Sequence, residues 1–134
     1  MKSIEELLEM PYWIVDILPE QVKADSPGQY FTVERHWMKT CGTEIKRRHA
    51  DIVLKLNCYY DVWLDEEPEV NPTPHRIAEA ILTRYVCILL GDSLIVSDPD
   101  DTNLTVYNPD ERLLSLLETL CMGEGLYLWQ PEQE

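Results

Sequence analysis

Three short apolar segments separated by tight turns constrain the fold of this chain most strongly. Gly91-Asp92 fits a two-residue turn between the first two segments, and residues 99–102 supply the next turn. Connections this short favour antiparallel pairing of consecutive strands. The pattern therefore predicts a three-stranded meander over residues 84–90, 93–98 and 103–107.

Four helices are predicted around this meander. Ser3 and Glu6 have the spacing of a capping box, and Thr73-Pro74 fits an N-cap followed by proline in the first turn. In the two longer segments, apolar residues recur at helical spacing. The expected helices cover residues 4–10, 43–57, 74–83 and 111–123.

Further strands are expected at residues 12–18, 29–36, 59–65 and 125–130, because β-branched and aromatic residues gather there between turn residues. A chain of 134 residues fits one hydrophobic core. The sequence thus predicts a single acidic α+β domain over residues 1–134. Its sheet is expected to be mostly antiparallel, with about six or seven strands and with helices packed on one face.

An internal duplication is a further hypothesis. Residues 12–65 and residues 93–130 are both expected to run strand, strand, helix, strand. WIVD at residues 13–16 is echoed by LIVS at 94–97, and FTV at 31–33 by LTV at 104–106. Short strand sequences resemble one another through composition alone, so chance similarity is the alternative.

The net charge of −14 is unevenly distributed and limits the partners that this chain is expected to bind. Between Arg35 and Lys55 six basic residues accompany two acidic ones, whereas Arg112 is the only basic residue from Tyr85 onward. This acidity disfavours nucleic acid, whose phosphates need Lys and Arg. A basic partner protein or a homo-oligomer is expected instead.

The expected location is the cytoplasm, in soluble form and without membrane contact. The longest apolar run, residues 85–90, is far shorter than the roughly twenty residues that cross a bilayer. Residues 1–9 carry three glutamates where an export signal has a basic start and an apolar run. The four cysteines are expected to be buried, reduced thiols.

Strand alternation predicts an aromatic sheet face, which is the candidate binding surface. Tyrosine and tryptophan anchor interfaces because one ring is both apolar and polar-tipped. The alternative is that a loop, a helix or a second subunit simply covers this face. The candidate binding residues are Tyr59, Asp61, Trp63, Tyr107, Tyr127 and Trp129.

No catalytic or metal-binding arrangement is predicted, and no cofactor is expected. His49 lies on the apolar side of its expected helix, which favours burial against a hydrogen-bonding partner over catalysis. His36, Cys41 and His49 could converge as metal ligands, but their spacings match no common zinc pattern. The KRR run at residues 46–48 is expected to be a solvated helix face, with contact to an anionic ligand as the alternative.

Several strings of the chain resemble a family of small bacterial proteins of unknown function. They are MPYWIVDILP at residues 10–19, DSPGQYF at 25–31 and LNCYYD at 56–61, together with the ending around residues 125–131. The resemblance covers most of the chain. It implies a bacterial cytoplasmic origin and carries over no activity, ligand or catalytic residue.

These observations predict a non-enzymatic protein-interaction module that binds a basic partner or self-associates. Toxin-neutralising immunity proteins are one class of small proteins with a similar net negative charge. The alternative is a small-molecule-binding protein or an enzyme. It would use the aromatic face as a pocket wall, with Asp61 or His49 as the polar group.

Overall fold

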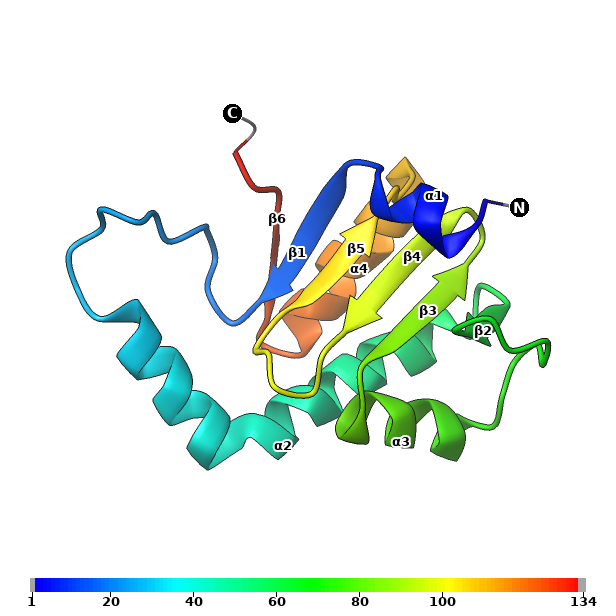
Figure 1. Cartoon of the computed structure of the whole chain (residues 1–134), viewed down its shortest axis with the longest axis horizontal. Helices are drawn as coiled ribbons and strands as arrows, with labels where there is room; N and C mark the ends of the chain where they lie inside the picture. The colour runs from blue at the N-terminus through cyan, green and yellow to red at the C-terminus, as the bar shows by residue number, and fades with distance from the viewer. Residues whose placement is uncertain (1, 133–134) are drawn as a thin grey trace.

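A computed structural model describes residues 2–132, which form one α+β domain (Figure 1). Its six-stranded sheet is antiparallel throughout, with strand order β2-β3-β4-β5-β1-β6. The predicted fold class is therefore confirmed. In chain order the elements are α1 (Ile4–Leu8), β1 (Tyr12–Asp16), α2 (Tyr30–Leu56), β2 (Val62–Leu64), α3 (Pro74–Thr83), β3 (Val86–Leu90), β4 (Ser93–Ser97), β5 (Leu104–Tyr107), α4 (Glu111–Gly123) and β6 (Tyr127–Trp129).

The predicted meander forms the centre of the sheet. β3 pairs with β4 and β4 with β5, which places Ile88, Ile95 and Val106 side by side on one face. Gly91 has a φ of 56° in the turn between β3 and β4, a left-handed conformation that favours glycine. The tight turn thereby fixes the register in which these strands bury their apolar side chains.

Residues 29–36 do not form the predicted strand, because residues 30–36 are the first part of α2. This single helix of 27 residues also contains the helix predicted over residues 43–57, except that it ends one residue earlier, at Leu56. A strand without a neighbour leaves its backbone groups unpaired, whereas a helix pairs them internally. The hydroxyl of Tyr30 also donates to Oε2 of Glu34 one turn later, at 2.7 Å. The first half of the chain consequently lacks its second strand, so the hypothesis of a duplication is wrong too.

The strands at both edges of the sheet are shorter than predicted. Before β2 the chain turns, and side-chain amides hold that turn. Nδ2 of Asn57 donates to the carbonyl oxygen of Tyr60 at 3.0 Å, and the amide of Val62 donates to Oδ1 of Asn71 at 2.9 Å. Because these side chains satisfy the backbone locally, residues 59–61 stay outside the sheet.

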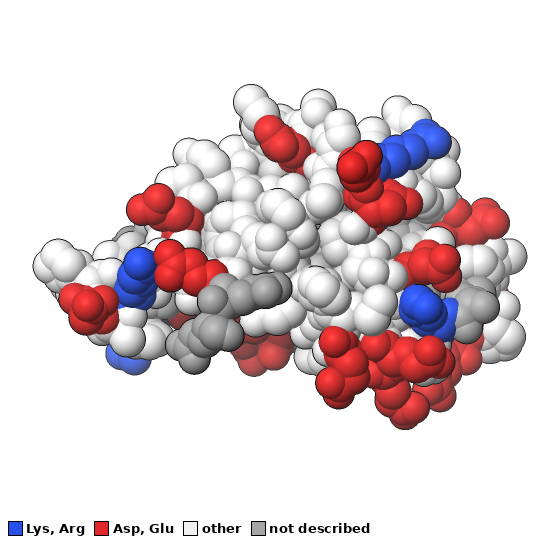
Figure 2. Space-filling model, turned by 90° about the horizontal axis from the view of Figure 1, so that it is seen from above, with Lys and Arg blue, Asp and Glu red and all other residues white. Residues whose placement is uncertain are grey.

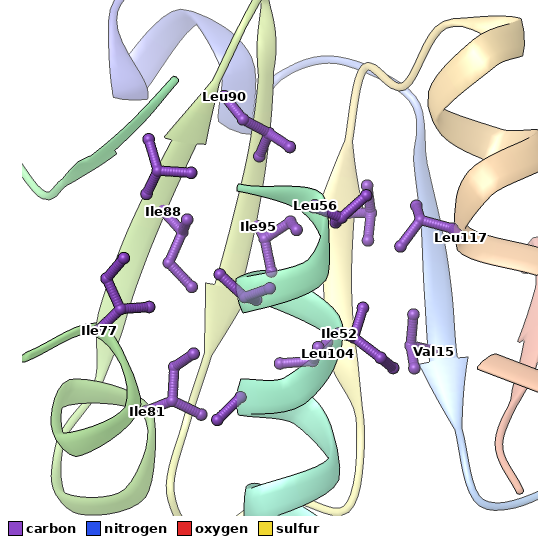
Figure 3. Close-up of a cluster of buried hydrophobic side chains, with 14 of the residues drawn as sticks. Val15, Ile52, Leu56, Ile77, Ile81, Ile88, Leu90, Ile95, Leu104 and Leu117 are labelled. Carbon is purple, nitrogen blue, oxygen red and sulfur yellow. The ribbon is translucent and has the colours of Figure 1, made fainter. Parts of the chain in front are cut away.

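Helices α2, α3 and α4 cover one face of the sheet and enclose the main hydrophobic core. Figure 3 shows Ile52 and Leu56 of α2 pointing toward Ile95, Leu104 and Val15 of the sheet. Burying a side chain of this kind contributes roughly 1.5–3 kcal/mol. The three helices are thus held to the sheet mainly by apolar contact.

Helix α1 lies on the opposite face, so the helices do not all pack on one side as predicted. The predicted capping box is present, with Ser3 and Glu6 each accepting a backbone hydrogen bond from the other. Leu7 is buried in a second cluster with Cys87, Leu89 and Leu94 of the central strands. α1 therefore covers only part of the second face.

Replacing Leu56 by alanine should lower the free energy of unfolding by about 2–5 kcal/mol, because the change leaves a cavity in the core. The Leu56 side chain is fully buried between α2 and the sheet. Urea unfolding followed by circular dichroism measures the loss. Leu8→Ala is the control, since Leu8 is 40% exposed. An equal loss in both variants would contradict this account of the core.

Candidate interaction surfaces

The second sheet face carries aromatic side chains, as strand alternation predicted. Trp63 is paired with Leu89, and Tyr107 lies between Leu94 and Tyr12 in the ladder. The ring centres of Tyr12 and Tyr107 are 5.5 Å apart. Two residues of β6 share this face, Tyr127 and Trp129.

Only part of this aromatic face is open. Trp63 packs against the cluster beneath α1 and is half-buried. Tyr12 and Tyr127, in contrast, are 42% and 46% exposed. The predicted surface therefore divides into a covered part that belongs to the fold and an open part over β1, β5 and β6.

Two of the candidate binding residues, Tyr59 and Asp61, are not on this face. Both lie in the turn between α2 and β2. The ring of Tyr59 lies beneath the Arg112 guanidinium, 5.9 Å from its centre to Cζ. Oδ1 of Asp61 accepts a hydrogen bond from Nδ2 of Asn71 at 2.9 Å. The alternation predicted for residues 59–65 fails here because the strand begins only at Val62.

An open groove of about 440 Å³ borders the open part of the aromatic face, where α1 ends and β1 begins. Apolar side chains and two carboxylates line it. Seen from above, acidic side chains crowd the side of the molecule that carries α1 (Figure 2), whose first turn holds Glu5 and Glu6. We call this hollow the acidic groove; it is lined by Glu9, Met10, Pro11, Tyr12, Gln130, Pro131 and Glu132.

The first part of α2, residues 30–42, projects from the body of the molecule (Figure 1). We call it the arm. Its apolar side chains have little to pack against: Phe31 is 74% exposed, Trp37 43% and Val33 40%. Aromatic side chains often anchor protein interfaces, so the arm is a candidate binding element.

The arm is also basic, in contrast to most of this acidic chain. Arg35 and Lys39 lie one helical turn apart and are exposed. Neither forms an ion pair with any residue between positions 2 and 132. Both cations are therefore available to a partner.

The arm was not predicted from the sequence, because residues 29–36 were expected to form a strand. A helical signal was present, since Val33, Trp37 and Cys41 recur every four residues and continue into the following helix. The β-branched and aromatic residues at positions 31–33 outweighed it.

A carboxylate tethers the arm to the body. Oε2 of Glu34 accepts from the hydroxyl of Tyr30 at 2.7 Å and from the hydroxyl of Thr102 at 3.3 Å. Thr102 lies buried in the loop between β4 and β5. Burial, together with the nearby Glu34, raises the pKa of Tyr30, so the phenol keeps the proton that it donates.

A lysine is buried where the arm meets the body. Lys46 is 2% exposed, and its Nζ donates to the carbonyl oxygen of Asp98 at 2.8 Å. Burial lowers the pKa of Lys46 to about 8. The prediction that residues 46–48 form a solvated helix face is therefore wrong for Lys46, because the loop between β4 and β5 covers this side chain.

His49 is fully buried one turn further along α2. Burial, with a smaller effect of the Lys46 charge, lowers its pKa to about 3. The backbone of Thr102 lies close enough to favour the charged form, but neither ring nitrogen makes a hydrogen bond of good geometry. The predicted burial is confirmed, while the expected hydrogen-bonding partner is missing.

The cysteines divide into two buried and two exposed thiols, so the prediction of buried thiols is right for Cys87 and Cys121 only. Burial raises the pKa of Cys121 to about 12. Within the described part of the chain, no three His, Cys, Asp or Glu side chains form a group that could hold a metal ion. Of the three metal ligands considered, Cys41 is exposed on the arm, whereas His49 is fully buried in the core-facing half of α2.

The chain matches no protein-family model, no curated protein and no solved structure. The resemblance to small bacterial proteins and the cytoplasmic location stay predictions. So does the alternative of a small-molecule site on the aromatic face. Among residues 2–132, no helix combines the length and the apolar character needed to cross a bilayer.

Replacing His49 by leucine should make the protein less sensitive to acid. The pKa of His49 is about 3 in the folded state, against about 6.5 in an unfolded chain. Between these values the unfolded state binds the extra proton, so the wild type loses stability as the pH falls. We expect it to lose about 2 kcal/mol more than the variant between about pH 7 and pH 5. Urea unfolding at both pH values measures this, and equal losses would contradict an unpartnered buried imidazole.

Replacing Glu34 by alanine should loosen the arm and leave the core intact, because Glu34 links Tyr30 to Thr102. Amide hydrogen exchange over residues 30–42 should accelerate by roughly tenfold, the effect of losing a hydrogen bond to a charged group. Lys39→Ala on the exposed side of the arm is the control. Equal acceleration over residues 45–56 would show that Glu34 supports the whole helix instead.

Proposed function

We propose that this protein is a non-enzymatic protein-interaction module whose binding element is the arm. One observation carries the proposal: Phe31 is 74% exposed and Trp37 43% exposed on a helix that projects from the body. Aromatic side chains are common among the few residues that dominate binding energy at protein interfaces, since they bury a large area with few rotatable bonds. Exposing them to water is unfavourable unless a partner covers them.

Charge supports the same proposal. The arm carries Arg35 and Lys39 on a chain with a net charge of −14. Exposed cations beside aromatic anchors accelerate encounter with an acidic surface and orient the two partners. The acidic faces of the body, in turn, favour a basic partner, so the module offers both signs of charge at different places.

The test compares binding by the full chain with binding by the arm variant Phe31→Ser/Trp37→Ser. Each protein is immobilised, incubated with lysate of its native cells and with purified untagged copies of the same chain, and washed at low and then high salt. At least one partner should bind the wild type at a stoichiometric level and fail to bind the arm variant, because the variant lacks the anchors.

The matched control is Tyr85→Ser/Met122→Ser, which removes two exposed apolar side chains elsewhere on the surface. This control should bind the same partner as the wild type. Identical sets of bound proteins for the wild type and the arm variant would exclude the arm as the binding element.

A further inference from the structure

We infer that the partner of the arm is a second copy of this chain, which receives the arm in its acidic groove. The inference rests on the proposed function and adds the identity of the partner. It requires three things. The groove must match the arm in charge and apolar character, and the arm must be unable to reach the groove of its own chain. The ion pair already present at the groove must also be weak enough for a cation of the arm to replace Lys23.

The arm needs a surface with two properties. Phe31 needs an apolar hollow, and Arg35 and Lys39, which follow it at four-residue spacing along the same side of the helix, need carboxylates at its rim. A partner that lacks either would leave rings exposed to water or cations without counter-charges. The surface that receives the arm is therefore acidic and apolar at the same place.

The acidic groove has both properties. Met10, Pro11 and Tyr12 form part of its apolar lining, and Glu9 and Glu132 contribute carboxylates. Its volume of about 440 Å³ exceeds that of a single tryptophan side chain. The open tyrosines of the aromatic face continue from its edge, so a docked arm would contact an apolar surface on leaving the groove.

One chain does not place its own arm in its own groove. The groove lies where β1 begins, whereas the arm is tethered through Thr102 at the other end of the sheet. Figure 1 shows this separation: the start of β1 and the end of β6, whose neighbouring residues line the groove, lie at the top of the molecule, and the arm lies at the lower left. No arm residue lines the groove. A second copy is needed to bring the two together.

The carboxylate of Glu132 already takes a cation in the single chain. Nζ of Lys23 lies 3.3 Å from its Oε1, and both side chains are more than half exposed. Exposed pairs of this kind are weak and exchange readily. An arginine or lysine from the arm of another copy can therefore replace Lys23 at small cost.

A charge exchange tests this inference. The arm variant is Arg35→Glu/Lys39→Glu, and the groove variant is Glu9→Lys/Glu132→Lys. Alone, each variant brings like charges together at every arm-groove contact. In a mixture, a reversed arm meets a reversed groove and a native arm meets a native groove, so both contacts of a mixed pair are complementary.

Sedimentation velocity of the purified proteins over a range of concentrations measures self-association. The wild type should associate, and each variant alone should associate roughly thirtyfold more weakly, as for the loss of an interface anchor. An equimolar mixture should recover to within roughly threefold of the wild type. Association should also weaken as salt rises, because charges at an exposed rim are screened.

The matched control is Glu66→Lys/Glu118→Lys, which changes net charge as the groove variant does but at exposed positions away from the groove. It should associate like the wild type. A wild type that stays monomeric at every concentration would overturn the inference, and so would a mixture no stronger than its components. The proposed function would survive either result if the arm still governed capture of another protein, and would fail with the inference if it did not.

Discussion

Packing of the second half of α2 against the sheet is the interaction on which the rest of the structure depends. Ile52, Val53 and Leu56 are fully buried in the core that α3 and α4 also share. The same helix continues past the sheet as the arm, bending on the way (Figure 1). Gly42, the one glycine of α2, lies in the segment between the arm and the buried half. The bend means that the buried half of α2 does not by itself fix the direction of the arm. The hydrogen bond from the hydroxyl of Thr102 to Glu34 helps to set that direction.

The way this chain uses its few cations explains why the arm stands out. Lys46 is buried beneath a loop, Lys55 pairs with Glu124, and Arg84 pairs with Asp65. Surface pairs of this kind contribute less than about 1 kcal/mol each, but they neutralise cations within the body. Arg35 and Lys39 of the arm, like Lys2 and Arg112, form no ion pair with any residue between positions 2 and 132. On the arm these unpaired cations lie close to the Phe31 ring, which is 74% exposed.

Much of the fold followed from local patterns, and the candidate site followed less well. The meander and the capped helices are specified by neighbouring residues, through turns such as Gly91-Asp92 and caps such as Asp110, whose side chain accepts from the amide of Leu113. The aromatic face was predicted because alternation is also local. Its partial cover by α1 was not, because the cluster that holds Leu7 with Leu89 and Leu94 joins residues far apart in the chain.

The sequence by itself determined where the helices and strands of the second half lie, that the sheet is antiparallel, and that the chain is strongly acidic. These properties depend on composition, on turns and on spacing within a few residues. Only the tertiary structure decided that residues 30–36 are helical, that Tyr59 and Asp61 leave the aromatic face, and that an arm and a groove exist. The reason is that a segment such as residues 30–36 has no strong preference of its own. Its state depends on whether a neighbouring strand is present to pair with it, and long-range packing settles that.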